Sequence, residues 1–228
     1  MPRDGRTGRN SASREPMFNA PWIVLTLVAA LIAAHAWREM AHAGVERLAL
    51  TSADLTVGRW PPLVTYMFVH AGWAHVLMNA AFTLAFGAPV ARFLGGGPRG
   101  AASFVAFFLV CGVIAALAYA GLLGLTDPGG GWALVGASGA ASGLMGAAAR
   151  LIEGRGRLGS VRGRTVVAMT LGWIAINAVL GLSGLTPGAA GAPVAWEAHI
   201  FGFFAGLALI GLFARAAGKD ERLIAKAP

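Results

Sequence analysis

The chain has 228 residues, of which 57% are apolar and only 12% charged, whereas roughly 25% of the residues of a typical soluble domain are charged. This composition excludes an ordinary soluble domain and predicts a membrane protein. The net charge of +8 does not indicate a nucleic-acid partner, because the arginines are dispersed among separate connections without interleaved aromatic residues. The single cysteine, Cys111, cannot form an intramolecular disulfide, and we interpret it as a lipid-facing or packing residue.

Six apolar segments follow one another along the chain. They cover residues 20–36, 73–94, 100–123, 138–152, 165–182 and 195–213. Since about 20 residues span a hydrocarbon core, the pattern predicts an all-α, polytopic bundle of six transmembrane helices. The fourth segment is too short to reach both membrane faces, so we expect its first residue, Ser138, to lie in a recess. The 33 glycines favour close helix packing in lipid.

The basic residues are distributed unevenly between the two sides of this bundle. Of the 18 basic residues, all but Arg38, Arg47 and Arg59 lie before the first segment, after the last, or in or at the edge of the second and fourth connections. The positive-inside rule then places both termini in the cytoplasm, and the loops that contain Arg47, Asp127 and Ala190 outside. We expect basic cytoplasmic tails at 1–15 and 217–228 around a membrane domain at 16–216.

The first apolar segment also has features of a cleavable signal peptide, with basic residues before it and small residues after it. Its removal would leave five spans and place one terminus outside, so we interpret it as a retained anchor. The connection 37–65 is amphipathic and is expected to lie in the membrane interface. His35 and His42 are interpreted as interfacial residues without a role.

Three short motifs place polar side chains at the ends of apolar segments. Polar groups at membrane depth are energetically costly, so their presence suggests a functional site. In HAGWAHVLMN (residues 70–79), His75 and Asn79 lie one helical turn apart. Both side chains can donate hydrogen bonds to a developing oxyanion. The alternative is that they form polar contacts between helices.

The second motif, GASG, surrounds Ser138 with Gly136 and Gly139. The glycines leave the hydroxyl open to a substrate, and the helix N-terminus favours negative charge there. The residue types therefore fit a nucleophile, although a serine at this position also commonly caps a helix.

The third motif, AHIFGFFAG (residues 198–206), contains His199 with Gly202 and Gly206 on the same helical face. Gly139 and Gly143 have similar spacing on the fourth segment, so the two helices can approach closely enough for a serine–histidine hydrogen bond. A structural histidine is the alternative. No acidic third member is evident, because Glu197 points away from His199 and Asp127 lies in a loop.

A metal site formed by His70, His75 and His199 is a further alternative. No carboxylate or thiol completes such a ligand set at helical spacing, so we expect neither a metal nor another cofactor. A small transporter would show interrupted helices in repeated halves, and no such pairing is evident.

Together the three motifs resemble those of the rhomboid family of intramembrane serine proteases, in its bacterial form with a six-helix core. HAGWAHVLMN is similar to the family's H-x4-H-x3-N, GASG to its GxSG, and AHIFGFFAG to its AH-x2-G-x3-G, and the resemblance covers about residues 16–216.

The resemblance implies that Ser138 is the nucleophile and His199 the general base. It also implies that His75, Asn79 and the Ser138 backbone N–H form the oxyanion hole, and that His70 is structural. The implied substrates are single-span or polytopic membrane proteins in a bacterial inner membrane. The alternative is a non-proteolytic rhomboid-like protein that binds membrane helices.

Two positions depart from the family pattern. An aromatic residue often follows the nucleophile by four positions, and here that residue is Ser142. A Trp-Arg pair of the first outer loop is absent, and Pro61 and Pro62 occupy the corresponding spacing.

Overall fold

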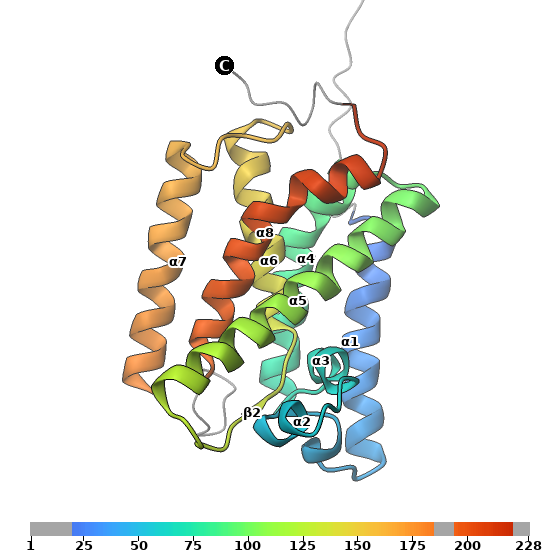
Figure 1. Cartoon of the computed structure of the whole chain (residues 1–228). Coiled ribbons are helices and arrows are strands. Elements are labelled where there is room, and N and C mark those ends of the chain that lie inside the picture. Colours follow the sequence, from blue (N-terminus) through green and yellow to red (C-terminus); the bar gives the residue numbers. More distant parts are fainter. Residues whose placement is uncertain (1–19, 185–193, 221–228) are drawn as a thin grey trace, which may run out of the picture.

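The structure, a computed structural model, describes residues 20–184 and 194–220 and shows an α-helical bundle (Figure 1). Its long helices are α1 (Trp22–Met40), α4 (Trp73–Leu94), α5 (Pro98–Thr126), α6 (Ser138–Glu153), α7 (Arg164–Ser183) and α8 (Trp196–Ala216). All except α6 are long and apolar enough to cross a membrane. The predicted polytopic, all-α architecture is thereby confirmed. Of the predicted tails, 1–15 and 221–228 lie outside the described residues.

Helix α6 is the centre of the bundle. It contacts α4, α5, α7 and α8, and Gly139, Ala140, Ala141, Gly143 and Ala147 are among its buried residues. These small side chains allow neighbouring backbones to approach closely. With 16 residues, α6 is about 24 Å long, which is shorter than a hydrocarbon core of about 30 Å.

The first connection of the bundle, residues 41–72, is structured. It contains η1 (Val45–Arg47), β1 (Leu50–Thr51), α2 (Ser52–Thr56), α3 (Pro62–Thr65) and η2 (Tyr66–Phe68). Strand β1 pairs antiparallel with β2 (Ala133–Leu134), with Leu50 opposite Leu134. The Ser52 N–H also donates to the Trp132 carbonyl at 3.2 Å. These bonds join the first connection to the loop that leads into α6, a link that the sequence does not predict.

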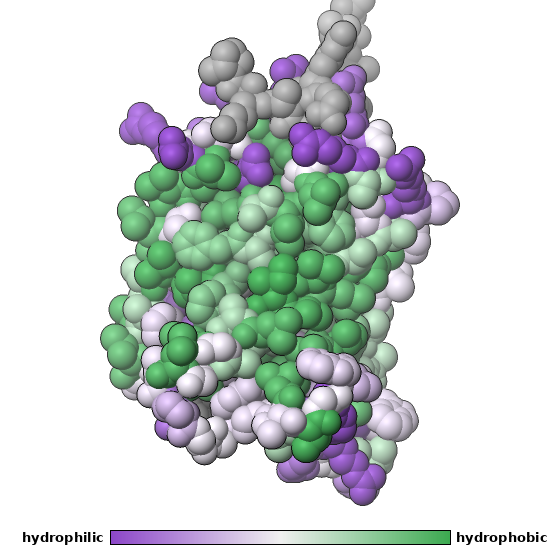
Figure 2. Space-filling model, in the orientation of Figure 1, coloured by the Kyte–Doolittle hydropathy of each residue, from purple (hydrophilic) through white to green (hydrophobic). Residues whose placement is uncertain are grey.

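The surface of the bundle separates into an apolar belt and two polar ends (Figure 2). The long helices expose large apolar side chains, among them Leu84, Leu117, Leu171, Val179 and Leu212. One end of the bundle is where α4, α6 and α8 finish. The described basic residues at this end are Arg92, Arg99, Arg150, Arg155, Arg157, Arg162, Arg164, Arg215 and Lys219, whereas Arg38, Arg47 and Arg59 lie in or beside the first connection at the other end. An apolar belt between polar ends is the surface of an integral membrane protein.

The structure shows the surroundings of two residues, His35, which differs from its prediction, and Cys111, which takes the second of its two predicted roles. His35 is not interfacial: its side chain is completely buried and packs edge-on against Trp73, with 4.8 Å between ring centroids, because α1 packs along α4. Cys111 is also fully buried. A side chain added to Gly143 would collide with it, so Cys111 is a packing residue between α5 and α6 and does not face lipid.

Candidate active site

Ser138 and His199 are hydrogen-bonded across two helices. Ser138 is the first residue of α6 and His199 lies in the first turn of α8, and the Ser138 Oγ is 2.8 Å from the His199 Nε2. Both side chains are only partly buried. The structure thus brings together the two residues for which the sequence predicts a nucleophile and a base.

Glycines of the two helices make this proximity possible. A Cβ atom added to Gly202 would collide with the Gly139 carbonyl, and one added to Gly206 would collide with the Gly143 carbonyl. The backbones of α6 and α8 are therefore in direct contact at two successive turns, as GxxxG-like spacing predicts. A serine and a histidine have short side chains, so they can meet only where their helices approach this closely.

The loop before Ser138 enters the bundle from the lower end of α5 in Figure 1, and α6 begins only after this loop has risen between the other helices. Gly136 has a φ of +105°, a conformation that is costly for residues with a side chain. Its N–H donates to the Tyr66 carbonyl at 2.9 Å. The next N–H, of Ala137, donates to the buried His70 Nε2 at 3.4 Å, so His70 holds the loop immediately before the serine.

His75 and Asn79 face this loop from α4. A Cβ atom on Gly136 would lie 2.6 Å from the His75 Nε2 and 3.5 Å from the Asn79 Nδ2, so a side chain there would collide with His75 and would touch Asn79. The His75 Nδ1 accepts a long hydrogen bond of 3.5 Å from the Ala71 N–H. This bond favours the tautomer in which Nε2 carries the proton. The Asn79 Nδ2 uses one proton on the His75 carbonyl at 3.2 Å and keeps a second.

Helix α7 contributes two neighbours of His199 that the motifs do not include. The Oδ1 of Asn177 lies 2.7 Å from the His199 Nδ1, and the Trp173 ring lies beside the imidazole, with 6.2 Å between centroids. The sequence contains one signal for Asn177, since it is an amide within an apolar span. No local pattern relates it to His199, because the contact depends on how α7 packs.

The two departures from the family pattern have structural counterparts. The hydroxyl of Ser142 donates to the Ser138 carbonyl at 2.7 Å, while Trp173 supplies an aromatic ring beside His199 from another helix. Arg38, near the end of α1, donates to the carbonyls of Ala43 and His70 in the first connection, both at 3.2 Å. A cation from α1 thus anchors the chain beside the site.

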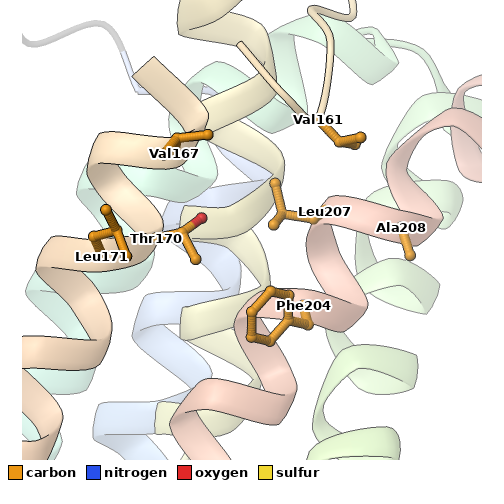
Figure 3. A pocket seen from close by; sticks show the side chains of 7 residues that line it. All are labelled: Val161, Val167, Thr170, Leu171, Phe204, Leu207 and Ala208. Atoms are coloured by element: carbon orange, nitrogen blue, oxygen red, sulfur yellow. The ribbon is translucent and has the colours of Figure 1, made fainter. Parts of the chain in front are cut away.

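An apolar cavity of about 340 Å³ lies elsewhere, between α7 and α8 (Figure 3). Its lining includes Val167, Leu171, Phe204 and Leu207, and the hydroxyl of Thr170 is the one side-chain oxygen among the residues drawn there. Neither Ser138 nor His199 lines it. Such a lining offers van der Waals contact to hydrocarbon chains but no pair of groups that could act as nucleophile and base. Among the described residues, no cluster of three histidine, cysteine or acidic side chains could hold a metal ion.

The fold and the site define a polytopic membrane protein whose central, short helix presents a serine to a histidine. A family model of the Rhomboid domain matches residues 57–216, and the chain belongs to the rhomboid family. This is a family of intramembrane proteases that act on membrane-protein substrates within the bilayer, and it includes members without protease activity. No curated protein sequence matches the chain significantly.

Proposed function

We propose that the protein is an active intramembrane serine endopeptidase that hydrolyses peptide bonds in or near the transmembrane segments of other membrane proteins. The observation that carries this proposal is the 2.8 Å distance between the Ser138 Oγ and the His199 Nε2. A nucleophile within hydrogen-bond reach of its base is the minimal arrangement for acyl transfer.

The first half of the reaction forms an acyl-enzyme. The Ser138 Oγ attacks the carbonyl carbon of the substrate while the His199 Nε2 takes the hydroxyl proton. The tetrahedral intermediate collapses when the bond to nitrogen breaks, and the leaving amine takes the proton from His199. In the second half, a water molecule gives a proton to His199 and attacks the ester carbonyl. The bond from this carbon to the Ser138 Oγ then breaks, His199 returns the proton to the Oγ, and the carboxyl product leaves.

The oxyanion of each tetrahedral intermediate needs donors that are already in place. The His75 Nε2 and the Asn79 Nδ2 face the loop at Gly136, two residues before the nucleophile. The Ser138 N–H lies at the first turn of α6, where the helix dipole also favours negative charge. We assign these three groups to the oxyanion hole, and His70 to a structural role beneath the loop.

The proposed enzyme lies in a bacterial inner membrane with both termini in the cytoplasm. The concentration of arginines at the end of the bundle where α8 finishes supports this orientation. Ser138 then begins α6 toward the outer side, and water for deacylation enters from there.

The alternative is a non-proteolytic relative that binds membrane helices. Such relatives typically lack the nucleophile or the base, whereas this chain has both at hydrogen-bonding distance. The retained pair favours the protease.

The test is cleavage of a panel of single-span membrane proteins in liposomes by the purified protein and by Ser138→Ala, His199→Ala and the double variant. We expect each single variant to abolish cleavage and the double variant to be no worse, since both residues serve the same step. Ser142→Ala is the matched control. It removes a hydroxyl one turn further along α6, and we expect it to cleave. Substantial cleavage by folded Ser138→Ala protein would refute the assignment.

A further inference from the structure

Asn177 is placed between a backbone carbonyl and the imidazole of His199. It is 3% exposed and, with Val166, one of the two buried residues of α7. Its Nδ2 donates to the Trp173 carbonyl at 2.9 Å, and its Oδ1 lies 2.7 Å from the His199 Nδ1. Both ends of a buried amide are thus satisfied, one within its own helix and one across to α8.

These two contacts fix which way the amide faces. A carbonyl oxygen can only accept a hydrogen bond, so the NH2 group of Asn177 must face Trp173. The opposite orientation would bring two acceptor oxygens together at 2.9 Å and leave no donor between them. The amide oxygen therefore faces His199.

The orientation of the amide determines the tautomer of His199. Because an amide oxygen is also only an acceptor, the His199 Nδ1 must carry a proton. A neutral imidazole has one such proton, so Nε2 has a free lone pair, and this atom is the one that lies 2.8 Å from the Ser138 Oγ. The Ser138 hydroxyl can then donate to Nε2, as a general base requires.

We propose that Asn177 is the third member of the catalytic group, a positioning residue that fixes the Nδ1–H tautomer of His199 and directs its Nε2 toward Ser138. The inference rests on the proposed function and extends the serine–histidine pair to a Ser-His-Asn arrangement. Trp173 limits rotation of the same imidazole, because its ring lies beside that of His199. Helix α7 therefore supplies both the polar and the aromatic support of the base.

The first measurement is the tautomer itself, read from the ¹⁵N spectrum of protein labelled in its histidines, with the His199 signal identified by its absence from His199→Ala. We expect protonated Nδ1 and unprotonated Nε2 in the resting protein. A resting His199 with the proton on Nε2 would overturn the proposal. This measurement does not depend on proteolysis.

The second measurement compares variants of Asn177 for cleavage in liposomes and for the rate of Ser138 modification by a fluorophosphonate. Asn177→Leu keeps the size of the side chain but removes the acceptor, and we expect both kcat and the modification rate to fall by about 10²-fold with little change in KM. Asn177→Asp restores the oxygen acceptor for the His199 Nδ1–H but places its second oxygen against the Trp173 carbonyl, so we expect it to recover part of both rates. A residue that acted only through its bond to Trp173 would show no recovery, because aspartate cannot donate that bond.

Thr170→Val is the matched control, since Thr170 lies two turns before Asn177 on α7 and its hydroxyl, within the described part of the chain, bonds to the Val166 carbonyl alone. We expect it to retain wild-type rates. Wild-type kcat in Asn177→Leu, or equal losses in Asn177→Leu and Thr170→Val, would overturn the role of Asn177. If Ser138→Ala still abolishes cleavage when either of these results is found, the proposed protease stands and only the role of Asn177 is refuted. The two proposals can therefore fail independently of each other.

Discussion

Gly202 of α8 packs directly on the carbonyl of Gly139 in α6, one residue after the Ser138 nucleophile candidate. One turn further on, Gly206 makes the same contact with the carbonyl of Gly143. The distance between the serine and the histidine thus depends on backbone contact at these two glycine pairs, where a side chain on Gly202 or Gly206 would push the helices apart.

The Gly202→Leu variant is therefore expected to lose at least about 10²-fold in kcat, because a displacement of about 1 Å between reacting groups has that cost. Gly172→Leu is the matched control, since Gly172 is a glycine of α7 with open space around its Cα. Cleavage in liposomes measures both, with circular dichroism to verify helix content. Wild-type turnover by Gly202→Leu would show that the contact does not position the pair.

Gly136 combines backbone strain with steric restriction. Its φ of +105° is unfavourable for alanine, and an alanine Cβ would lie 2.6 Å from the His75 Nε2. We expect Gly136→Ala to lower kcat by about 10²-fold or more, because either the loop or the imidazole must move. Gly131→Ala, in the same loop with no neighbour near its Cα, is expected to retain activity. Equal activities would argue against an oxyanion hole beside Gly136.

The proposed oxyanion hole predicts a particular kinetic signature. His75→Ala and Asn79→Ala should each lower kcat by about 10²-fold while KM changes little, since their hydrogen bonds strengthen as charge develops on the substrate oxygen. Steady-state cleavage of one substrate at several mole fractions in the bilayer separates the two constants. A rise in KM at constant kcat would instead assign these residues to substrate binding.

Much of the fold is predictable because it follows from local properties of the chain. Apolar length locates the helices, and the predicted fourth segment, 138–152, differs by one residue from α6 (Ser138–Glu153). The meeting of Ser138 with His199 is predictable as well, because glycine spacing indicates which helix faces can touch. These features need no knowledge of how distant elements pack.

The features that escaped prediction depend on tertiary packing. His35 lies near the end of a span, where interfacial histidines are common, but the first connection and α4 cover it completely. Strand β1 has two residues, too few for an alternating pattern. Asn177 is an isolated polar residue in an apolar helix, and only the packing of α7 on α8 pairs it with His199.

The Asp54 carboxylate, in the first connection, is expected to contribute to the free energy of unfolding in a pH-dependent way. Burial raises the pKa of the Asp54 carboxyl, but hydrogen bonds from Arg59 and Thr51 outweigh burial, and the net pKa is lowered. A lowered pKa in the folded state means that the carboxylate stabilises the fold at neutral pH, and that this contribution is lost as the pH falls through the folded pKa.

Asp54 and Thr51 form a capping box at the start of α2. Asp54→Asn is accordingly expected to lower Tm in detergent by about 2–4 °C at pH 7, the effect of losing ~1 kcal/mol from such a cap in a chain of this size. At about pH 3, below the pKa of about 3.9 that an aspartate has in an unfolded chain, the difference in Tm between Asp54→Asn and wild type should be smaller than at pH 7. Asp127→Asn, a change at an exposed aspartate, serves as the control. A Tm difference that is the same at both pH values would contradict the role of the ionised carboxylate.

The orientation in the membrane determines which part of a substrate is released. If the arginine-rich end is cytoplasmic, the loop with Gly131 lies outside and the loop with Ser160 inside. Single cysteines at these exposed positions, in a Cys111→Ala background, can be tested with a membrane-impermeant maleimide on intact cells. Ala190, in the third predicted outer loop, lies outside the described residues, so Gly131 is the better site.

We expect labelling of Gly131→Cys on intact cells, and labelling of Ser160→Cys only after the cells are permeabilised. We also expect cleavage to release the outer part of a substrate. The reverse labelling pattern would invert both the topology and the side from which substrates are cut.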